Sequence, residues 1–248
     1  MTDPLTARVR AAHGDAWQVQ GRLRETAGGG ALELHGIRLM ASGLPYPHFN
    51  NGDVTAPDAD LEGARAFYAQ RRVPWGVCVP PDLPWPHGRH LFRKRLMGLP
   101  AAGFRPAPAV PGLRIERAGP GELETVVAVD TAGFGSDPAR ERPWMEPQLG
   151  ARRAEVALAT LGGEPVATAY ALRSDGRAGP CLWLGGVAVL AAARRRGVGA
   201  AISTWLLARG LAAGAQLAHL QADNDDAARV YTRLGFAETG GLDVYVEV

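Results

Sequence analysis

The stretch Val187-Ala-Val-Leu-Ala-Ala-Ala-Arg-Arg-Arg-Gly-Val-Gly-Ala-Ala-Ile202 decides the fold. It predicts a strand, a tight basic turn rich in glycine, and the first turn of a helix. The first backbone amides of a helix lack intrahelical acceptors and carry partial positive charge, so a glycine turn that leads into a helix can bind phosphate. Arg194, Arg195 and Arg196 add charge beside this turn. An ordinary connection between strand and helix, with solvated arginines, is the competing interpretation.

The residues of this stretch do not match two other kinds of phosphate-binding loop. A Walker loop needs lysine and then serine or threonine after its last glycine, whereas Ala200 and Ala201 follow Gly199. A dinucleotide-binding fingerprint that starts at Gly197 needs a third glycine where Ile202 stands. The sequence therefore indicates neither a Walker loop nor a dinucleotide fingerprint here.

Composition limits the class of protein. The chain has 248 residues, of which 46% are hydrophobic and 21% charged, enough for one large domain or two ordinary ones. A membrane span needs roughly 18 or more uninterrupted apolar residues, and the sequence has no such run. The first residues contain no apolar signal core, and Cys78 and Cys181 are the only cysteines, so we expect a cytoplasmic protein without disulfides.

The charge pattern and the histidines argue against two kinds of partner. The formal net charge is +2, and neither half of the chain is basic enough for a nucleic-acid footprint. Lys94 is the only lysine, so the arginines reflect compositional bias more than recognition. No carboxylate or cysteine accompanies His48, His87 and His90 at ligand spacing, and we expect no metal site.

The first half of the chain alternates short predicted elements with turns. The patterns predict helices over 4–23, 60–72 and 90–97, strands over 31–40 and 74–79, and a turn over 42–52. The prolines within 101–111 mark a linker. We therefore expect a first domain over residues 1–108 and a second over 109–248.

The second half predicts a mixed sheet flanked by helices. Its expected order is β-α-α-β-β-β-α-β-α-β-β. The patterns predict strands at 113–117, 155–160, 165–173, 181–190 and 216–222 and near 236 and 244, with helices at 119–134, 140–149, 198–213 and 227–234. The three strands between 155 and 190 are joined by tight turns and should be antiparallel neighbours.

Two motifs in this half resemble the GNAT superfamily of N-acetyltransferases. The family signature Gln/Arg-x-x-Gly-x-Gly/Ala after the fourth strand corresponds to Arg194-Arg-Arg-Gly197-Val-Gly199. The second family element, Asn-x-x-Ala-x-x-x-Tyr-x-x-x-Gly-Phe, corresponds to Asn224, Ala227, Tyr231, Gly235 and Phe236. The resemblance implies an α/β protein with the GNAT acyl-CoA N-acyltransferase fold, an α+β mixed sheet, in the second half.

The first half is similar only in outline to the degenerate N-terminal unit of tandem GNAT proteins. Its segment Gly43-Leu-Pro-x-Pro-x-Phe-Asn50 carries that similarity, and it has no copy of the glycine loop. The resemblance therefore implies a smaller, degenerate GNAT-like α/β unit with a single active site, which lies in the second half.

The resemblance also implies a cofactor and the residues that contact it. Acetyl-CoA would be the cosubstrate, with no metal. Its pyrophosphate would be held by amides of residues 195–200 and its pantetheine by the backbone of the preceding strand. The implied cofactor residues are Val187, Ala188, Val189, Arg194, Arg195, Arg196, Gly197, Val198, Gly199, Ala200, Asn224 and Tyr231.

Tyr231 is the implied catalytic residue, as proton donor to the departing thiolate, whereas the general base stays open. Many family members carry a glutamate on the fourth strand, but residues 181–189 contain no carboxylate. Glu155, Tyr170, Asp243 and Tyr245 are candidates, and a neutral amine or a water relay would need no protein base. Cys181 is a poor candidate nucleophile, since no histidine is near it in sequence.

The resulting expectation is an acetyltransferase that moves an acetyl group from acetyl-CoA to an amine by direct attack. The acceptor would be a small molecule or a peptide, with no nucleic-acid or membrane partner, and either a monomer or a homodimer fits. Two alternatives stay open: a non-catalytic acyl-CoA-binding or regulatory protein that kept the cleft, and an O-acyltransferase or an enzyme for longer acyl donors.

Overall fold

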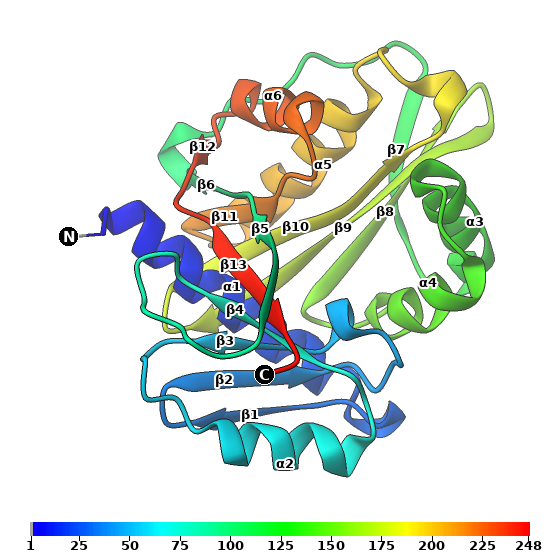
Figure 1. Ribbon diagram of the computed structural model, residues 1–248. Helices are drawn as coiled ribbons and strands as arrows, with labels where there is room; N and C mark the ends of the chain where they lie inside the picture. Colours follow the sequence, from blue (N-terminus) through cyan, green and yellow to red (C-terminus); the bar gives the residue numbers. More distant parts are fainter. Residues whose placement is uncertain (1) are drawn as a thin grey trace. The chain divides into compact units, whose positions relative to one another are not determined.

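The computed structural model describes residues 2–248, which form two compact units with a mixed sheet each (Figure 1). The first unit contains the chain up to Met97, together with Gly176–Ala178 and Glu238–Val248. The second contains Gly98–Asp175 and Gly179–Ala237. A single boundary between residues 108 and 109 does not describe this division, because the C-terminal segment returns to the first unit.

The first unit is built on a six-stranded sheet with the order β1-β2-β3-β4-β13-β5. Its elements are α1 (Pro4–Arg22), the 3-10 turn η1 (Glu25–Ala27), β1 (Gly30–Leu34), β2 (Ile37–Ala41), η2 (Pro47–Phe49), β3 (Asn51–Val54), α2 (Leu61–Arg71), β4 (Gly76–Val79), β5 (Arg89–Lys94) and β13 (Leu242–Val246). Helix α2 packs Phe67 and Tyr68 against Ile37 and Leu39 of β2, which closes an apolar core. The Tyr68 hydroxyl donates to the Met40 carbonyl oxygen at 3.1 Å, so its one polar group is satisfied inside that core.

Three predictions for the first half are wrong. The segment 31–40 is not one strand but the hairpin of β1 and β2, which turns at Gly36 with a φ of +64°. Residues 51–54, expected partly as turn, form β3 between β2 and β4. The expected helix over 90–97 is absent from the described chain, because β5 pairs there with β13 and the next strand begins at Leu96. These errors share a cause: long-range strand pairing overrides local periodicity.

The second unit carries a seven-stranded sheet with the order β12-β6-β11-β10-β9-β8-β7. Its elements are β6 (Leu96–Pro100), η3 (Ala101–Gly103), β7 (Leu113–Ala118), η4 (Pro120–Glu122), α3 (Leu123–Phe134), α4 (Pro138–Met145), η5 (Glu146–Gln148), β8 (Ala154–Leu161), β9 (Glu164–Gly176), β10 (Gly179–Val189), η6 (Ala191–Ala193), α5 (Val198–Ala212), β11 (Leu217–Gln221), α6 (Asp225–Arg233) and β12 (Ala237–Glu238). The expected antiparallel run of three strands is confirmed for β8 with β9, and β10 follows as the next neighbour.

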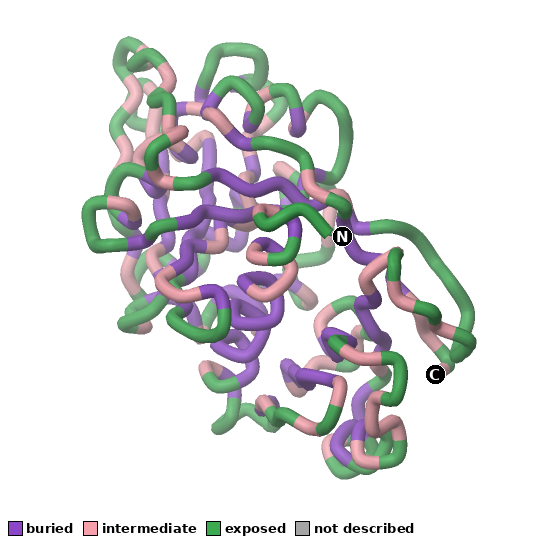
Figure 2. The backbone as a smooth tube through the Cα atoms, turned by 90° about the vertical axis from the view of Figure 1, so that its left-hand side faces the viewer, coloured by how far each residue is buried: buried purple, intermediate pink, exposed green. Residues whose placement is uncertain are grey.

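Helices cover both faces of this sheet (Figure 1). On one face, Gly133 of α3 lies against Ala188 of β10. On the other, Gly210 of α5 lies against Leu182 of the same strand. Figure 2 shows how buried residues follow the strands and the inner sides of the helices. The sheet is therefore the middle layer of the unit, with α3 packed on one face and α5 on the other.

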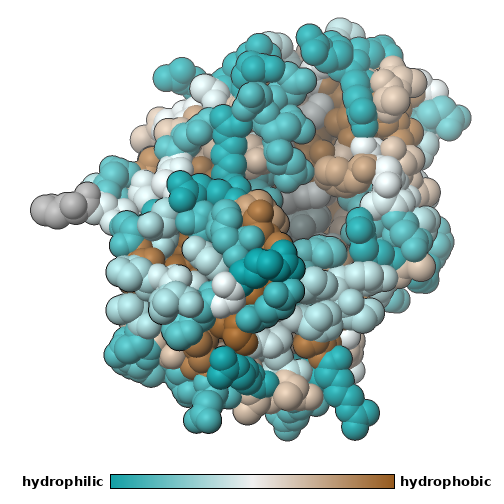
Figure 3. Space-filling model, in the orientation of Figure 1, coloured by the Kyte–Doolittle hydropathy of each residue, from teal (hydrophilic) through white to brown (hydrophobic). Residues whose placement is uncertain are grey.

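The surface is mixed. On the face drawn in Figure 3, hydrophobic side chains are interspersed with hydrophilic ones. The large exposed hydrophobic residues include Leu32, Leu91, Phe92 and Phe134, of which Phe134 ends α3 and is 49% exposed. No helix within residues 2–248 is both long and apolar enough to cross a bilayer.

Candidate active site

The N-terminus of α5 presents a row of backbone amides without backbone acceptors. Gly197 caps the helix with a φ of +82°, in the left-handed region that favours glycine. The first backbone hydrogen bond of the helix runs from the Ala201 amide to the Gly197 carbonyl oxygen at 2.9 Å. Among the described residues, the amides of 195–200 donate to no backbone carbonyl. This row of amides, together with the helix dipole, forms an anion-binding end of the kind that phosphate occupies.

The three arginines of this turn differ in what they contact. The Arg194 guanidinium donates to the carbonyl oxygen of Gly133 at 2.6 Å and to that of Val189 at 3.0 Å. It thereby fastens the turn to the end of α3 and to the end of β10. Arg195 is exposed and has a φ of +62°, and Arg196 is exposed as well. Arg194 is thus a structural tie in this arrangement, while the other two side chains face solvent.

Strand β10 has an unpaired edge beside this loop. The parallel pairing of β10 with β11 runs from Cys181 opposite Leu217 to Trp183 opposite His219. Strand β10 continues to Val189, beyond the last of these pairs. The backbone of residues 185–189 therefore has no β11 partner, and an extended chain could pair with it as an added strand.

Strand β10 bends at Gly185 and Gly186. Only glycine fits at these two positions, because the ring of Tyr170 fills the space that a side chain would need. A Cβ on Gly185 would lie 2.8 Å from Tyr170 Cε2, and one on Gly186 would lie 2.5 Å from Tyr170 Cε1. Gly186 also has a φ of +56°. Trp144 of α4 donates from Nε1 to the Tyr170 hydroxyl at 3.4 Å. The bend in β10 is consequently supported from α4 through Tyr170.

Helix α6 carries the second motif. The Asn224 side chain accepts from the Ala227 amide at 2.9 Å and caps the helix. Two turns later, Tyr231 is 9% exposed, and its ring packs edge-on against Phe236 with centroids 5.9 Å apart. Burial and the nearby Asp223 carboxylate raise the pKa of Tyr231 well above its ordinary value. Its hydroxyl therefore stays protonated at neutral pH and is available as a hydrogen-bond donor.

A pair of buried carboxyls on α3 and α4 was not found from the sequence. Asp130 is 4% exposed, and it lies one helical turn before Gly133, which contacts Ala188 of β10. Burial first, and the Glu141 carboxylate second, raise the pKa of Asp130 to about 7. Glu141 lies one turn before Trp144 and pairs with Arg140 at 2.6 Å. A carboxyl directly after the apolar run 126–129 was the available sequence signal.

The base candidates expected from the sequence lie in different places. Glu155 pairs with the Arg209 guanidinium at 2.6 Å, and Tyr170 supports the bend in β10. Asp243 and Tyr245 belong to β13 in the first unit, where Arg93 holds Asp243 at 2.8 Å and lowers its pKa. Cys181 is 1% exposed. Of these candidates, only Tyr170 lies beside the glycines of β10.

A buried polar cluster in the first unit has the residue types of a metal site but not the hydrogen-bond arrangement. Ligand atoms of His13, Asp53 and Cys78 lie within 4.8 Å of one another. Trp17 donates to His13 Nε2 at 2.6 Å, so the proton of the neutral ring is on Nδ1, which faces Asp53 at 2.7 Å. A metal on Nδ1 would leave the ring proton on Nε2, where it would point at the N–H of Trp17. Burial also raises the pKa of Cys78 to about 12, which disfavours the thiolate that metals bind.

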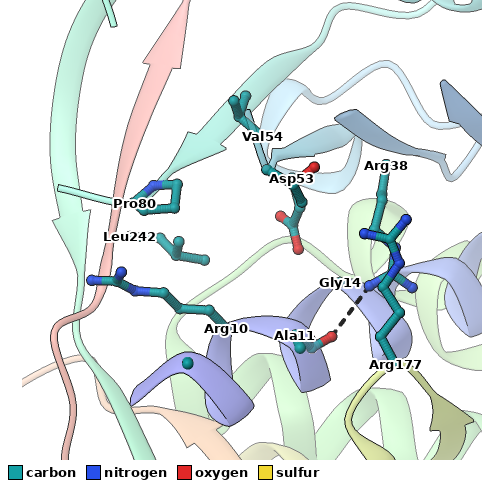
Figure 4. A pocket seen from close by; sticks show the side chains of 11 residues that line it. Arg10, Ala11, Gly14, Arg38, Asp53, Val54, Pro80, Arg177 and Leu242 are labelled. Carbon is teal, nitrogen blue, oxygen red and sulfur yellow. Dashed lines mark hydrogen bonds between the residues drawn. The ribbon is translucent and has the colours of Figure 1, made fainter. Parts of the chain in front are cut away.

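A small cavity of about 180 Å³ adjoins this cluster. Figure 4 shows the Asp53 carboxylate directed into it, with Arg10 on one side and Arg38 and Arg177 on the other. Arg38 pairs with Asp15 at 2.6 Å and Arg10 with Asp82 at 2.6 Å. Arg177 pairs with Glu33, so the charges of all three arginines are already matched, and the cavity suits ordered waters better than a substrate.

The comparisons with known proteins agree with the geometry of the second unit. The Acetyltransferase (GNAT) family profile matches residues 126–236, which include most of α3, the bend in β10, the amide row and α6. The chain contains a GNAT acetyltransferase domain. A domain of this family belongs to the acyltransferase class, and the expected resemblance is confirmed. No curated protein matches the chain in sequence.

Solved structures share the fold of the GNAT domain and of the first unit together. A GCN5-related N-acetyltransferase from Kribbella flavida is similar over 98% of this chain and 96% of its own, with a TM-score of 0.69 and 19% identity. A conserved protein of unknown function from Staphylococcus epidermidis covers 88% and 93%, with a TM-score of 0.65 and 15% identity. A Novosphingobium aromaticivorans structure described under the GNAT family covers 93% and 96%, with a TM-score of 0.59 and 20% identity. At these identities the likeness concerns the fold alone, and it confirms the expected α/β class.

Proposed function

We propose that this chain transfers an acetyl group from acetyl-CoA to the amine of a small molecule or peptide. The observation that carries the proposal is the row of free amides at 195–200, next to the edge of β10 that β11 leaves unpaired. An elongated donor with phosphates at one end and amide groups along its arm fits these two features. The same geometry would not select a compact anion.

The residues that would hold the cofactor divide by chemistry. The amides of residues 195–200 would donate to its pyrophosphate, with Gly197, Val198, Gly199 and Ala200 leaving the approach open. The backbone of Val187 and Val189 would pair with its pantetheine arm, while Ala188 faces α3. Arg194 would act by holding the loop, and Asn224 by capping α6. Arg195 and Arg196 would meet the phosphates from the solvent side.

Asp130 would then accept the proton of the amine, and Tyr231 would donate a hydrogen bond to the leaving sulfur. The amine nitrogen attacks the thioester carbon, the C–S bond breaks, and the amine proton passes to the Asp130 carboxylate. A base whose pKa is near 7 is half ionised at neutral pH and suits this step. Tyr231 donates a hydrogen bond to the departing sulfur. Its raised pKa makes full proton transfer to a thiolate unfavourable, so stabilisation by the hydrogen bond is its main role.

The test is release of free thiol from acetyl-CoA in the presence of a panel of amines, for the wild type and Tyr231→Phe. We expect turnover for the wild type, and a loss of at least tenfold in kcat for the variant with nearly unchanged acetyl-CoA affinity. Unchanged kcat in Tyr231→Phe would refute its role. Alcohol acceptors in the same assay test whether the protein is an O-acyltransferase. Longer acyl-CoA donors test whether it uses a longer acyl group than acetyl.

A non-catalytic acyl-CoA-binding or regulatory protein is the second candidate. Strand β10 lacks the glutamate that many family members carry there, and this observation favours it. Tight binding of acetyl-CoA by calorimetry without thiol release on any amine would support this candidate and contradict the first.

A further inference from the structure

The second unit has a large basic cavity that the proposed function does not use. It has a volume of about 640 Å³, within the range of small-molecule sites. It lies on the α5 side of the sheet, between the strands and the C-terminal half of that helix. Its apolar lining includes Leu182 and Leu206, which are 2% and 1% exposed. The cavity is therefore a hollow between the sheet and α5 whose lining is partly apolar.

Five arginines line this cavity. They are Arg117 of β7, Arg152 and Arg153 of the turn before β8, Arg173 of β9, and Arg209 of α5. One carboxylate faces them: Glu155, which pairs with Arg209. The Arg173 guanidinium donates to the Arg152 carbonyl oxygen at 2.6 Å.

Most of this positive charge is unmatched. Within residues 2–248, no carboxylate pairs with Arg117, Arg152, Arg153 or Arg173. By contrast, the same unit pairs Arg114, Arg140, Arg142 and Arg229 with carboxylates elsewhere on its surface. Compositional bias toward arginine explains scattered guanidinium groups, but it does not explain why unmatched ones converge on one cavity. Like charges that line one cavity repel, and a bound anion would relieve the repulsion.

The cavity is separate from the amide row. Gly197 and Arg209 are twelve residues apart along α5, which corresponds to about 18 Å at 1.5 Å per residue. The amide row lies at the N-terminus of the helix and the cavity at its other half. A ligand in the cavity would thus leave the expected acetyl-CoA site free.

We propose that this cavity binds a small organic polyphosphate of the nucleoside triphosphate class. Its phosphates would contact Arg117, Arg152, Arg153 and Arg173, because planar guanidinium groups donate pairs of hydrogen bonds to phosphate oxygens. Its planar base would lie against the apolar part of the lining, which includes Leu182 and Leu206. This proposal does not depend on the proposed acetyl transfer, and each of the two can be tested without the other.

The experiment measures ATP, inorganic tripolyphosphate and adenosine by titration calorimetry at low and high salt. Three variants accompany the wild type: the double substitution Arg152→Gln with Arg153→Gln, the control Arg105→Gln with Arg233→Gln, and Gly199→Trp at the amide row. Arg105 and Arg233 are exposed residues of the same unit without a carboxylate partner among the described residues, so the control removes the same charge. Circular dichroism checks that each variant is folded.

We expect ATP to bind the wild type, the control and Gly199→Trp alike, and the Arg152/Arg153 variant at least tenfold more weakly. Tripolyphosphate should bind with stronger salt dependence than ATP, and adenosine most weakly. Equal ATP binding by the Arg152/Arg153 variant and the wild type would overturn the proposal. So would the absence of binding to the wild type, or a loss confined to Gly199→Trp, since the phosphates would then occupy the amide row.

Discussion

The ring of Tyr170 occupies the space that a side chain on Gly186 would need. A Cβ at Gly186 would lie 2.5 Å from Tyr170 Cε1, a separation that requires one of the two to move. Because Gly186 also has a φ of +56°, an alanine there meets both the ring and an unfavourable backbone conformation. The bend in β10 thus depends on this pair of residues.

Gly186→Ala should lower kcat for acetyl transfer by at least tenfold and lower the free energy of unfolding by about 2 kcal/mol. The matched control is Gly162→Ala, where φ is +65° and no atom lies within 4 Å of the added Cβ. The control carries the backbone strain alone, about 1 kcal/mol, and should keep full activity. Steady-state kinetics and urea unfolding measure both variants. Equal activity of the two variants would show that the contact with Tyr170 has no role.

Arg194→Ala should weaken acetyl-CoA binding indirectly. The substitution removes hydrogen bonds to the carbonyl oxygens of Gly133 and Val189 and frees the loop, so we expect KM for acetyl-CoA to rise about fivefold, roughly 1 kcal/mol. The comparison variant is Arg195→Ala, which removes an exposed arginine that we expect to meet the phosphates directly, so its effect should weaken in salt. Because carbonyl contacts are less sensitive to salt than phosphate contacts, the effect at Arg194 should persist in 0.5 M salt. An effect that disappears in salt would instead indicate direct phosphate contact.

Asp130 should make catalysis depend on pH near neutrality. With a pKa of about 7, the carboxyl becomes ionised as pH rises through that value, so kcat/KM should rise over pH 6–8 with a neutral-amine acceptor. Asp130→Asn should lose most activity together with this rise. Glu141→Gln removes the nearby charge that raises the pKa of Asp130, so its profile should shift to lower pH with activity retained. A Glu141→Gln profile that does not move would contradict the coupling.

The same carboxyl should oppose folding at high pH. Between about pH 4 and pH 7, folded Asp130 holds a proton that the unfolded chain has lost, so its contribution makes stability fall as pH rises through this window. Asp130→Asn has no such charge to bury. It should therefore be more stable than the wild type above pH 7, by at most about 4 kcal/mol, and show a smaller gain near pH 4. Urea unfolding at pH 4.5 and pH 8 tests this sign, and a variant less stable at pH 8 would contradict it.

The glycine turn before α5 and the start of α6 could be predicted from sequence because their capping contacts are local. Gly197 caps α5 and Asn224 caps α6 through contacts within three or four residues, which a spacing motif captures. The carboxyl pair could not be found in this way, since Asp130 and Glu141 are on different helices and their electrostatic coupling depends on packing. Likewise, the position of β13 between β4 and β5 follows from pairing across most of the chain. No local pattern near Val244 indicates which sheet it joins.

The buried pair of His13 and Asp53 should be a major source of stability in the first unit. Asp53 accepts from His13 Nδ1 at 2.7 Å and supplies negative charge to a buried group that includes Lys94, whose ammonium lies 3.4 Å from His13 Nε2. Burial lowers the pKa of His13, so the ring is neutral and needs an acceptor for its single proton. Asp53→Asn leaves Lys94 buried with less negative charge nearby and should cost about 3 kcal/mol. The control Asp82→Asn breaks an exposed ion pair with Arg10 and should cost under about 1 kcal/mol. Urea unfolding of both variants measures the difference, and equal costs would mean that the buried pair contributes no more than a surface one.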